Sequence, residues 1–165
     1  MKIAISIHVG TFSIWSNGVN QNAIYLAMLL KKAGHDAYLL YSRDSKTNRT
    51  KESLEKLKLD VGIINLKNAH EYKFDVVIQL GLAIEVKDAK KFRENNKNIK
   101  FVSYECGNHF FIDTEKIIYD KHSNAITPDY VKPDQIWSIP QMENTNLHYY
   151  AFKKKCNNVT VVPFI

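Results

Sequence analysis

The chain has 165 residues, which fits one domain and is enough to bury a proper core. It is 45% hydrophobic and 24% charged, with six glycines and four prolines, a composition that excludes a disordered or fibrous protein. Two cysteines, far apart in sequence, indicate no disulfide framework, and no apolar run is long enough for an export signal or a membrane span. We therefore expect a cytoplasmic protein.

The formal net charge is +6, and the lysines that produce it are spread along the chain at 31–32, 51–58, 87–100 and 153–155. A nucleic-acid surface usually concentrates such charge beside stacking aromatic residues. Dispersed lysines instead favour solvated helix faces, with weak attraction to anionic lipid headgroups or to phosphorylated ligands as the alternative. We expect no nucleic-acid partner.

The predicted elements begin with a buried strand, because Ile3, Ile5 and Ile7 alternate with small residues. A loop over 10–18 follows, and apolar residues at helical spacing then predict a helix over 19–30, with Gly34 as its left-handed closing residue. Further strands are predicted at 37–41, 61–66, 75–80, 99–104, 135–139 and 159–162, and further helices at 50–57, 86–95 and 144–152.

Strands that alternate with helices and are apolar on both faces indicate a parallel sheet covered on both sides. The sequence therefore predicts an α/β fold, a Rossmann-like doubly wound parallel sheet of about seven strands with helices on both faces. No repeat or linker divides the chain, so residues 1–165 are expected to form a single domain.

In such a sheet, ligands bind beyond the carboxyl ends of the strands where the strand order reverses. With the usual order, the loops after the first and fourth strands face each other there, and the segment 105–109 flanks them. The helix start after the first loop offers backbone N–H groups to a phosphate, although an ordinary capping turn would look similar. The candidate contacts in this region are His8, Gly10, Thr11, Trp15, Asn17, Gly18, Asn20, Gln21 and Asn22.

Other candidate residues follow the later strands. Glu105 and His109 come directly after the fifth strand and are candidates for acid–base catalysis or for orienting a sugar, whereas the simpler interpretation of Glu105 is an exposed strand end. The remaining candidate contacts are Gly81, Gln141, Glu143 and Asn144. Cys106 and His109 lack a second pair of ligands, so no metal is expected. Neither a Gly-x-Gly-x-x-Gly fingerprint nor a P-loop is present.

The run from Asn17 to Asp36 resembles the first loop, helix and turn of the two-domain GT-B glycosyltransferases that use nucleotide-sugars with retention. In that family a glycine turn opens the helix, Leu-Ala-x-x-Leu continues it and Gly-His precedes the second strand, as at Gly18, 26–30 and 34–35 here. The segments 75–81, 99–107 and 159–164 resemble the fourth strand, the fifth strand and the passage into the second domain. The motifs at 6–11, 15–18 and 139–144 are similar to a little-characterised group of bacterial proteins regarded as glycosyltransferases.

The resemblance implies that this chain is the amino-terminal, acceptor-side domain of such an enzyme. It also implies that a carboxyl-terminal domain outside these residues holds most of the nucleotide-sugar, and that Gly18 approaches the donor diphosphate across the cleft. Many family members have a histidine just after the fifth strand, where this chain has Glu105. The abrupt end after Pro163 agrees with a missing second domain.

The expected function is transfer of a sugar from a nucleotide-sugar donor to an acceptor, with no covalent cofactor. The segment alone is expected to be inactive. The alternative is a free-standing flavodoxin-like module that binds a small phosphorylated ligand in the same loops.

Overall fold

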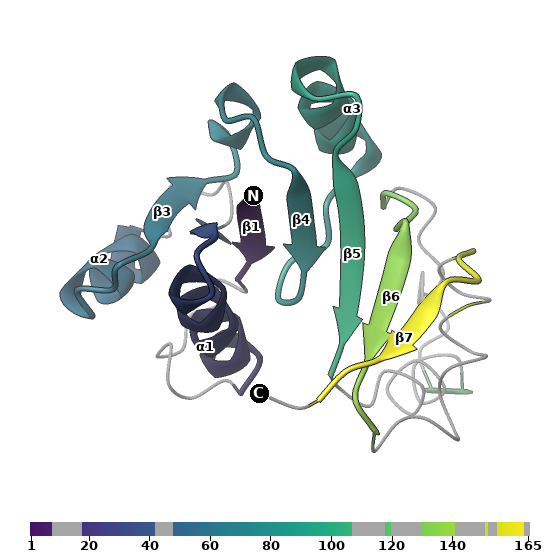
Figure 1. Cartoon of the computed structure of the whole chain (residues 1–165), viewed down its shortest axis with the longest axis horizontal. Coiled ribbons are helices and arrows are strands. Elements are labelled where there is room, and N and C mark those ends of the chain that lie inside the picture. Colours follow the sequence, from purple (N-terminus) through teal and green to yellow (C-terminus); the bar gives the residue numbers. More distant parts are fainter. Residues whose placement is uncertain are drawn as a thin grey trace.

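A sheet of seven parallel strands forms the centre of the described part of the chain (Figure 1). The computed structural model describes residues 1–7, 18–41, 48–106, 118–119, 130–140, 151 and 155–163, and at 48–51 the backbone alone. The strands are β1 (Lys2–Ser6), β2 (Asp36–Tyr41), β3 (Gly62–Asn65), β4 (Val76–Gln79), β5 (Lys100–Glu105), β6 (Gln135–Ser138) and β7 (Val159–Val161). The helices are α1 (Gly18–Lys32), α2 (Asn48–Lys56), α3 (Val86–Asn95) and the short 3-10 helix η3 (Ala69–Glu71).

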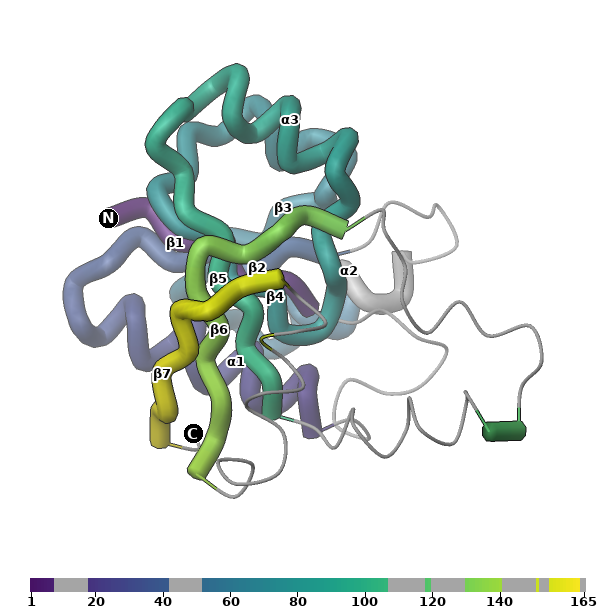
Figure 2. The backbone as a smooth tube through the Cα atoms, turned by 90° about the vertical axis from the view of Figure 1, so that its right-hand side faces the viewer, coloured from purple at the N-terminus to yellow at the C-terminus, as the bar shows by residue number. Residues whose placement is uncertain are grey.

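The strand order is β3-β2-β1-β4-β5-β6-β7, and every neighbouring pair is parallel. The predicted neighbourhood of the first and fourth strands is therefore confirmed. The order reverses between β1 and β4, as in the Rossmann arrangement and unlike the flavodoxin-like order, which runs 2-1-3-4-5. In Figure 1 the sheet fans from β3 at the left to β7 at the right, and in Figure 2 the edge formed by β6 and β7 faces the viewer.

Alternation along each strand divides the core into two layers. Ile3 and Ile5 of β1 belong to the cluster that contains Ile24 of α1 and Leu54 of α2. Ala4, between them, belongs to the cluster that contains Phe92 of α3. Helices therefore cover both faces of the sheet, α1 and α2 on one side and α3 on the other, as the apolar strands predicted.

The sequence predicted the elements closely, because each has a clear periodicity and clear ends. All seven strands and α1 to α3 lie within two residues of the predicted bounds. Gly34 has φ 85°, and the N–H groups of Gly34 and His35 donate to the carbonyls of Lys31 and Leu30, which closes α1 as predicted. The turn η3 was not predicted, and the predicted helix over 144–152 lies outside the described residues except at Ala151.

The turn after β4 is fastened to the end of β1 by one serine. The Ser6 hydroxyl accepts hydrogen bonds from the N–H groups of Leu80 and Leu82, both at 3.0 Å, and donates to the Leu82 carbonyl at 2.7 Å. The Gly81 N–H also donates to the Ser6 carbonyl, at 3.0 Å. Because Ser6 is fully buried, these bonds fix the turn that contains Gly81 at the point where the strand order reverses.

Replacing this serine tests its role in the fold. We expect Ser6→Ala to lower the free energy of unfolding by about 2–3 kcal/mol, because two backbone N–H groups lose their acceptor. Ser138→Ala is the matched control: Ser138 is equally buried at the end of β6, but its hydroxyl has no hydrogen-bond partner in the described ranges. Urea unfolding should show no loss of stability for the control, since it removes a buried hydroxyl that makes no hydrogen bond. Equal losses in both variants would contradict the role given to Ser6.

Candidate functional site

The start of α1 and the end of β5 meet at the carboxyl edge of the sheet. Since all strands are parallel, their carboxyl ends share this edge, and α1 begins there before running back to β2. The side-chain amide nitrogen of Asn22 lies 3.9 Å from the Cys106 sulfur, directly after β5. The structure thus brings the predicted helix start next to the predicted segment after the fifth strand.

Two predicted contacts at the start of α1 are buried. Asn20 is 4% exposed and Asn22 is 8% exposed, although surface asparagines are usual in the first turns of helices. Among the described residues, the Asn20 side-chain oxygen has no hydrogen-bond partner. A buried amide oxygen without a partner costs about 1–3 kcal/mol, so Asn20 is a group that a ligand hydroxyl can satisfy.

The other predicted contacts on α1 are more accessible. Gly18 is exposed at the first residue of the helix, and a Cβ placed there would meet no atom within 4 Å. Neither φ nor packing therefore requires glycine at this position. Gln21 is half-buried and already has a partner within the protein.

Glu105 is a buried residue, which contradicts its interpretation as an exposed strand end. Its exposed fraction is 5%, and the Ser103 hydroxyl donates to its Oε1 at 2.6 Å. In the β5–β6 register, Glu105 stands opposite Ser138, whose buried hydroxyl has no hydrogen-bond partner within the described ranges. A carboxylate and a free hydroxyl on neighbouring strands can together hold a hydroxyl-rich ligand.

These groups belong to a row of buried polar side chains at the ends of four neighbouring strands. The row shares the sheet face with Ala4, Val77 and Phe101, which pack with α3 farther from this edge. Its members are Ser6, Gln79, Ser103, Glu105 and Ser138.

The side chains of this row differ in their hydrogen-bond partners. Ser6 fastens the turn after β4, and the Gln79 side-chain oxygen accepts from the Ile84 N–H at 2.8 Å. The Ser103 hydroxyl instead donates a hydrogen bond to Glu105, and the Ser138 hydroxyl has no hydrogen-bond partner among the described residues. The first two are therefore explained by the fold, whereas the polar groups of β5 and β6 are candidates for ligand contact.

Sequence reasoning missed Ser103 and Ser138. The signal was present in β5, where Phe101, Ser103 and Glu105 are two residues apart and must share a face. For Ser138 the relevant fact is the register with Glu105, which only the structure supplies.

Cys106 is held as a thiol. Burial raises the pKa of the Cys106 thiol above its ordinary value, and the Glu105 carboxylate raises it further, against a lowering by the Asn22 amide. A thiol is a poor nucleophile, so this cysteine is not arranged for covalent catalysis. No group of three or more His, Cys, Asp or Glu residues in the described ranges can hold a metal ion.

Of the remaining predicted contacts, the structure describes only Gly81. Gly81 lies in the turn fastened by Ser6, at the reversal of strand order. The candidates that lie outside the described residues are His8, Gly10, Thr11, Trp15, Asn17, His109, Gln141, Glu143 and Asn144.

The strand order and the polar carboxyl edge define a Rossmann-like α/β domain. The chain belongs to the DUF2827 family, described as "Protein of unknown function", whose model matches residues 1–165. No curated protein matches it. Among solved structures, the crystal structure of yeast YNL200c is similar, with 15% sequence identity and a TM-score of 0.47 over 84% of this chain. The match spans 58% of the yeast chain. No helix in the described part of the chain is long and apolar enough to cross a membrane.

The position of Glu105 beside Cys106 predicts the pH range in which the thiol becomes reactive. Glu105→Gln removes a negative charge beside the thiolate, so the pKa of Cys106 should fall and its alkylation by iodoacetamide should begin at lower pH. Mass spectrometry of Cys106 across a pH series measures this midpoint. Glu94→Gln, on the far α3 face, is the charge-matched control and should leave it unchanged. An unchanged midpoint in Glu105→Gln would show that the carboxylate does not act on the thiol.

Proposed function

We propose that this chain is the acceptor-side, amino-terminal domain of a GT-B glycosyltransferase that moves a sugar from a nucleotide-sugar to an acceptor. The observation that carries the proposal is Asn20 in the first turn of α1, a buried amide whose oxygen has no hydrogen-bond partner in the described part of the chain. It lies in the helix start that Asn22 joins to the end of β5. This is the edge where sheets with this strand order bind ligands.

The groups at this edge suit the two parts of a nucleotide-sugar differently. The amino-terminal end of a helix carries partial positive charge, so the start of α1 suits the diphosphate. An amide oxygen accepts hydrogen bonds and repels phosphate oxygens, so the Asn20 oxygen suits a sugar hydroxyl. The open space beside Gly18 lets a ligand approach the helix start closely.

In this proposal, Glu105 acts on the acceptor hydroxyl. Its carboxylate is buried and held by the Ser103 hydroxyl, and the unpartnered Ser138 hydroxyl stands opposite it. A carboxylate in this position can orient an acceptor hydroxyl and take its proton as the hydroxyl oxygen bonds to the anomeric carbon of the sugar and the bond from that carbon to the nucleotide phosphate breaks, which releases the nucleotide. In this proposal most donor contacts belong to a second domain outside these 165 residues.

Calorimetric titration of the chain together with the second domain that the proposal requires, against a panel of nucleotide-sugars, tests the proposal. We expect one nucleotide class to bind, and Asn20→Leu to weaken that binding at least roughly tenfold, because a buried hydrogen bond to the ligand is lost. The same variant should be more stable without ligand by about 1 kcal/mol, since an unsatisfied oxygen is removed from the interior. Thermal unfolding measures this gain.

Asn98→Leu is the matched control, because it makes the same replacement at an exposed asparagine before β5, on the amino edge of the sheet. It should change neither ligand affinity nor, beyond about 0.5 kcal/mol, stability. The proposal fails if no nucleotide-sugar binds, or if Asn20→Leu binds as tightly as the original chain.

A further inference from the structure

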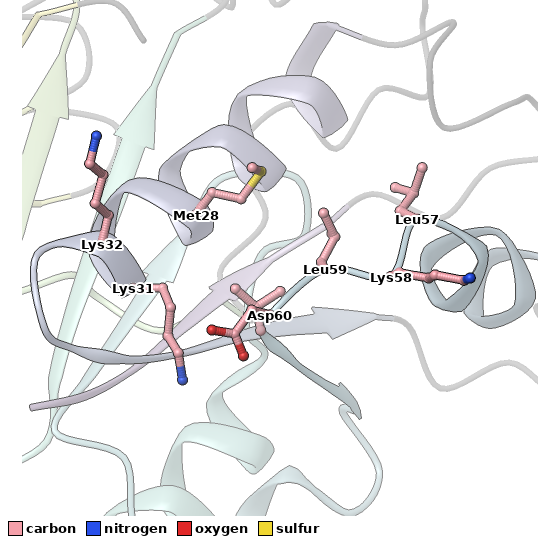
Figure 3. Close-up of a pocket in the computed structure, with 8 residues that line it drawn as sticks. Met28, Lys31, Lys32, Leu57, Lys58, Leu59 and Asp60 are labelled. Carbon is pink, nitrogen blue, oxygen red and sulfur yellow. The ribbon is translucent and has the colours of Figure 1, made fainter.

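A groove lies at the other end of α1, away from the candidate site. It is lined by Met28, Lys31 and Lys32 of α1 and by residues 57–61, which connect α2 to β3, and its volume is about 460 Å³. Figure 3 shows Met28 on the helix and Leu59 on the connecting segment at its two sides. Because α1 ends and β3 begins here, the groove lies at the amino edge of the sheet.

The groove combines an apolar floor with a basic rim. Leu57, Leu59 and Val61 are partly buried against the core below α1. Lys31, Lys32 and Lys58 supply three positive charges, against the single carboxylate of Asp60. A partner must therefore offer negative charge beside an apolar surface.

Exposed apolar side chains continue the groove along the outer face of α1. Tyr25, Met28 and Leu29 are 46%, 46% and 52% exposed. They are three and four residues apart, so they share one face of the helix, and Lys32 extends that face by another turn. Clustered large apolar side chains on a surface mark a contact with another molecule or a membrane.

We propose that this face, defined as the groove together with Tyr25 and Leu29, docks on the anionic phospholipid surface of a membrane. Lysine ammonium groups pair with lipid phosphates while their stems lie along apolar surface. Tyrosine, methionine and leucine side chains enter the boundary between headgroups and acyl chains. The chain's net charge of +6 adds attraction to the same surface.

The shape of this face favours a bilayer over a peptide partner. A peptide segment needs a slot that encloses it, whereas Tyr25 and Leu29 stand on the convex side of α1, outside the groove. A bilayer can contact both parts of this face, because its acyl boundary accepts the convex apolar side chains while its headgroups bind the lysines of the rim.

Docking would leave the candidate site accessible. α1 has 15 residues and is therefore about 22 Å long, with the candidate site at its first turns and this face at its last turns. The inference does not depend on sugar transfer, because it rests on a different end of the helix.

Co-sedimentation of the chain with vesicles tests the inference. We expect binding to vesicles of phosphatidylglycerol, little binding to vesicles of phosphatidylcholine, and weaker binding as ionic strength rises. The triple variant Lys31→Gln, Lys32→Gln and Lys58→Gln should lower the affinity for phosphatidylglycerol roughly 100-fold, since each lysine contributes about fivefold. Met28→Ser with Leu29→Ser should lower it roughly tenfold. Both variants change exposed or rim side chains, and circular dichroism checks their fold.

The control is Lys90→Gln and Lys91→Gln on α3 with Lys97→Gln just after it, which removes the same charge on the other sheet face. Lys90 and Lys97 line a basic hollow of about 450 Å³ there. A change below about threefold is expected.

If the control variant lost as much affinity for phosphatidylglycerol vesicles as the groove variant, net charge alone would explain the binding and the inference would be overturned. Absence of binding to these vesicles would overturn it as well. A dimer that forms without vesicles and is abolished by Met28→Ser with Leu29→Ser would assign the face to a second copy of the chain and also overturn it.

Discussion

The central position of β1 is the constraint on which the rest of the structure depends. β1 pairs with β2 on one side and with β4 on the other, so the strand order must reverse there. Parallel strands bring their carboxyl ends to one edge, and the connections that leave β1 and β4 run to opposite faces of the sheet. The Ser6 hydroxyl holds the turn after β4 against the end of β1, which keeps the edge beside the start of α1 in a fixed form.

Polar groups at this edge have two kinds of role. Ser6 and Gln79 satisfy backbone groups of the turn and so belong to the fold. Asn20 and Ser138 are as buried, yet each keeps a polar atom that finds no hydrogen-bond partner among the residues the structure describes. A buried polar atom without a hydrogen-bond partner destabilises the chain in the absence of a ligand. Natural proteins break the rule of satisfied polar groups mainly at functional sites, where a ligand can supply the missing hydrogen bond. The contrast within one edge is the physical basis for placing a site there.

The sequence predicted the fold well because the fold depends on local patterns. The isoleucines of β1, the lysines and Gly34 at the end of α1, and the apolar run in β4 each identify an element and its ends. The meeting of α1 with β5 followed from the strand order expected for such a sheet. Asn20 and Asn22 were selected as contacts, but their burial was not predictable, because a helical asparagine near an N-terminus usually caps or faces water.

The remaining parts of the site depend on long-range register. Ser138 becomes a candidate only when β6 pairs with β5 so that it stands opposite Glu105, and no local pattern fixes that pairing. Glu105 was predicted as a candidate with an exposed strand end as the alternative, and its burial against Ser103 contradicts the exposed strand end. The basic lysines were interpreted as dispersed, and only the packing of α1 against 57–61 gathers three of them around one groove.

The two ends of α1 thus differ in chemistry. Its first turns present buried neutral amides to the carboxyl edge, and its last turns present lysines and exposed apolar side chains to the exterior. In the proposals made above, one end faces a sugar nucleotide and the other a membrane. This arrangement suits an enzyme that delivers a sugar to an acceptor near a lipid surface.

The most direct test of the account is a map of backbone amide chemical shifts in the nitrogen-labelled chain during titration with a nucleotide-sugar that binds. The account predicts that the largest changes occur at 18–22, 81–82, 104–106 and 138–139, and that α3 and residues 57–61 change little. Changes concentrated on α3 or at the amino edge, with the start of α1 unaffected, would contradict a ligand site at the reversal of strand order.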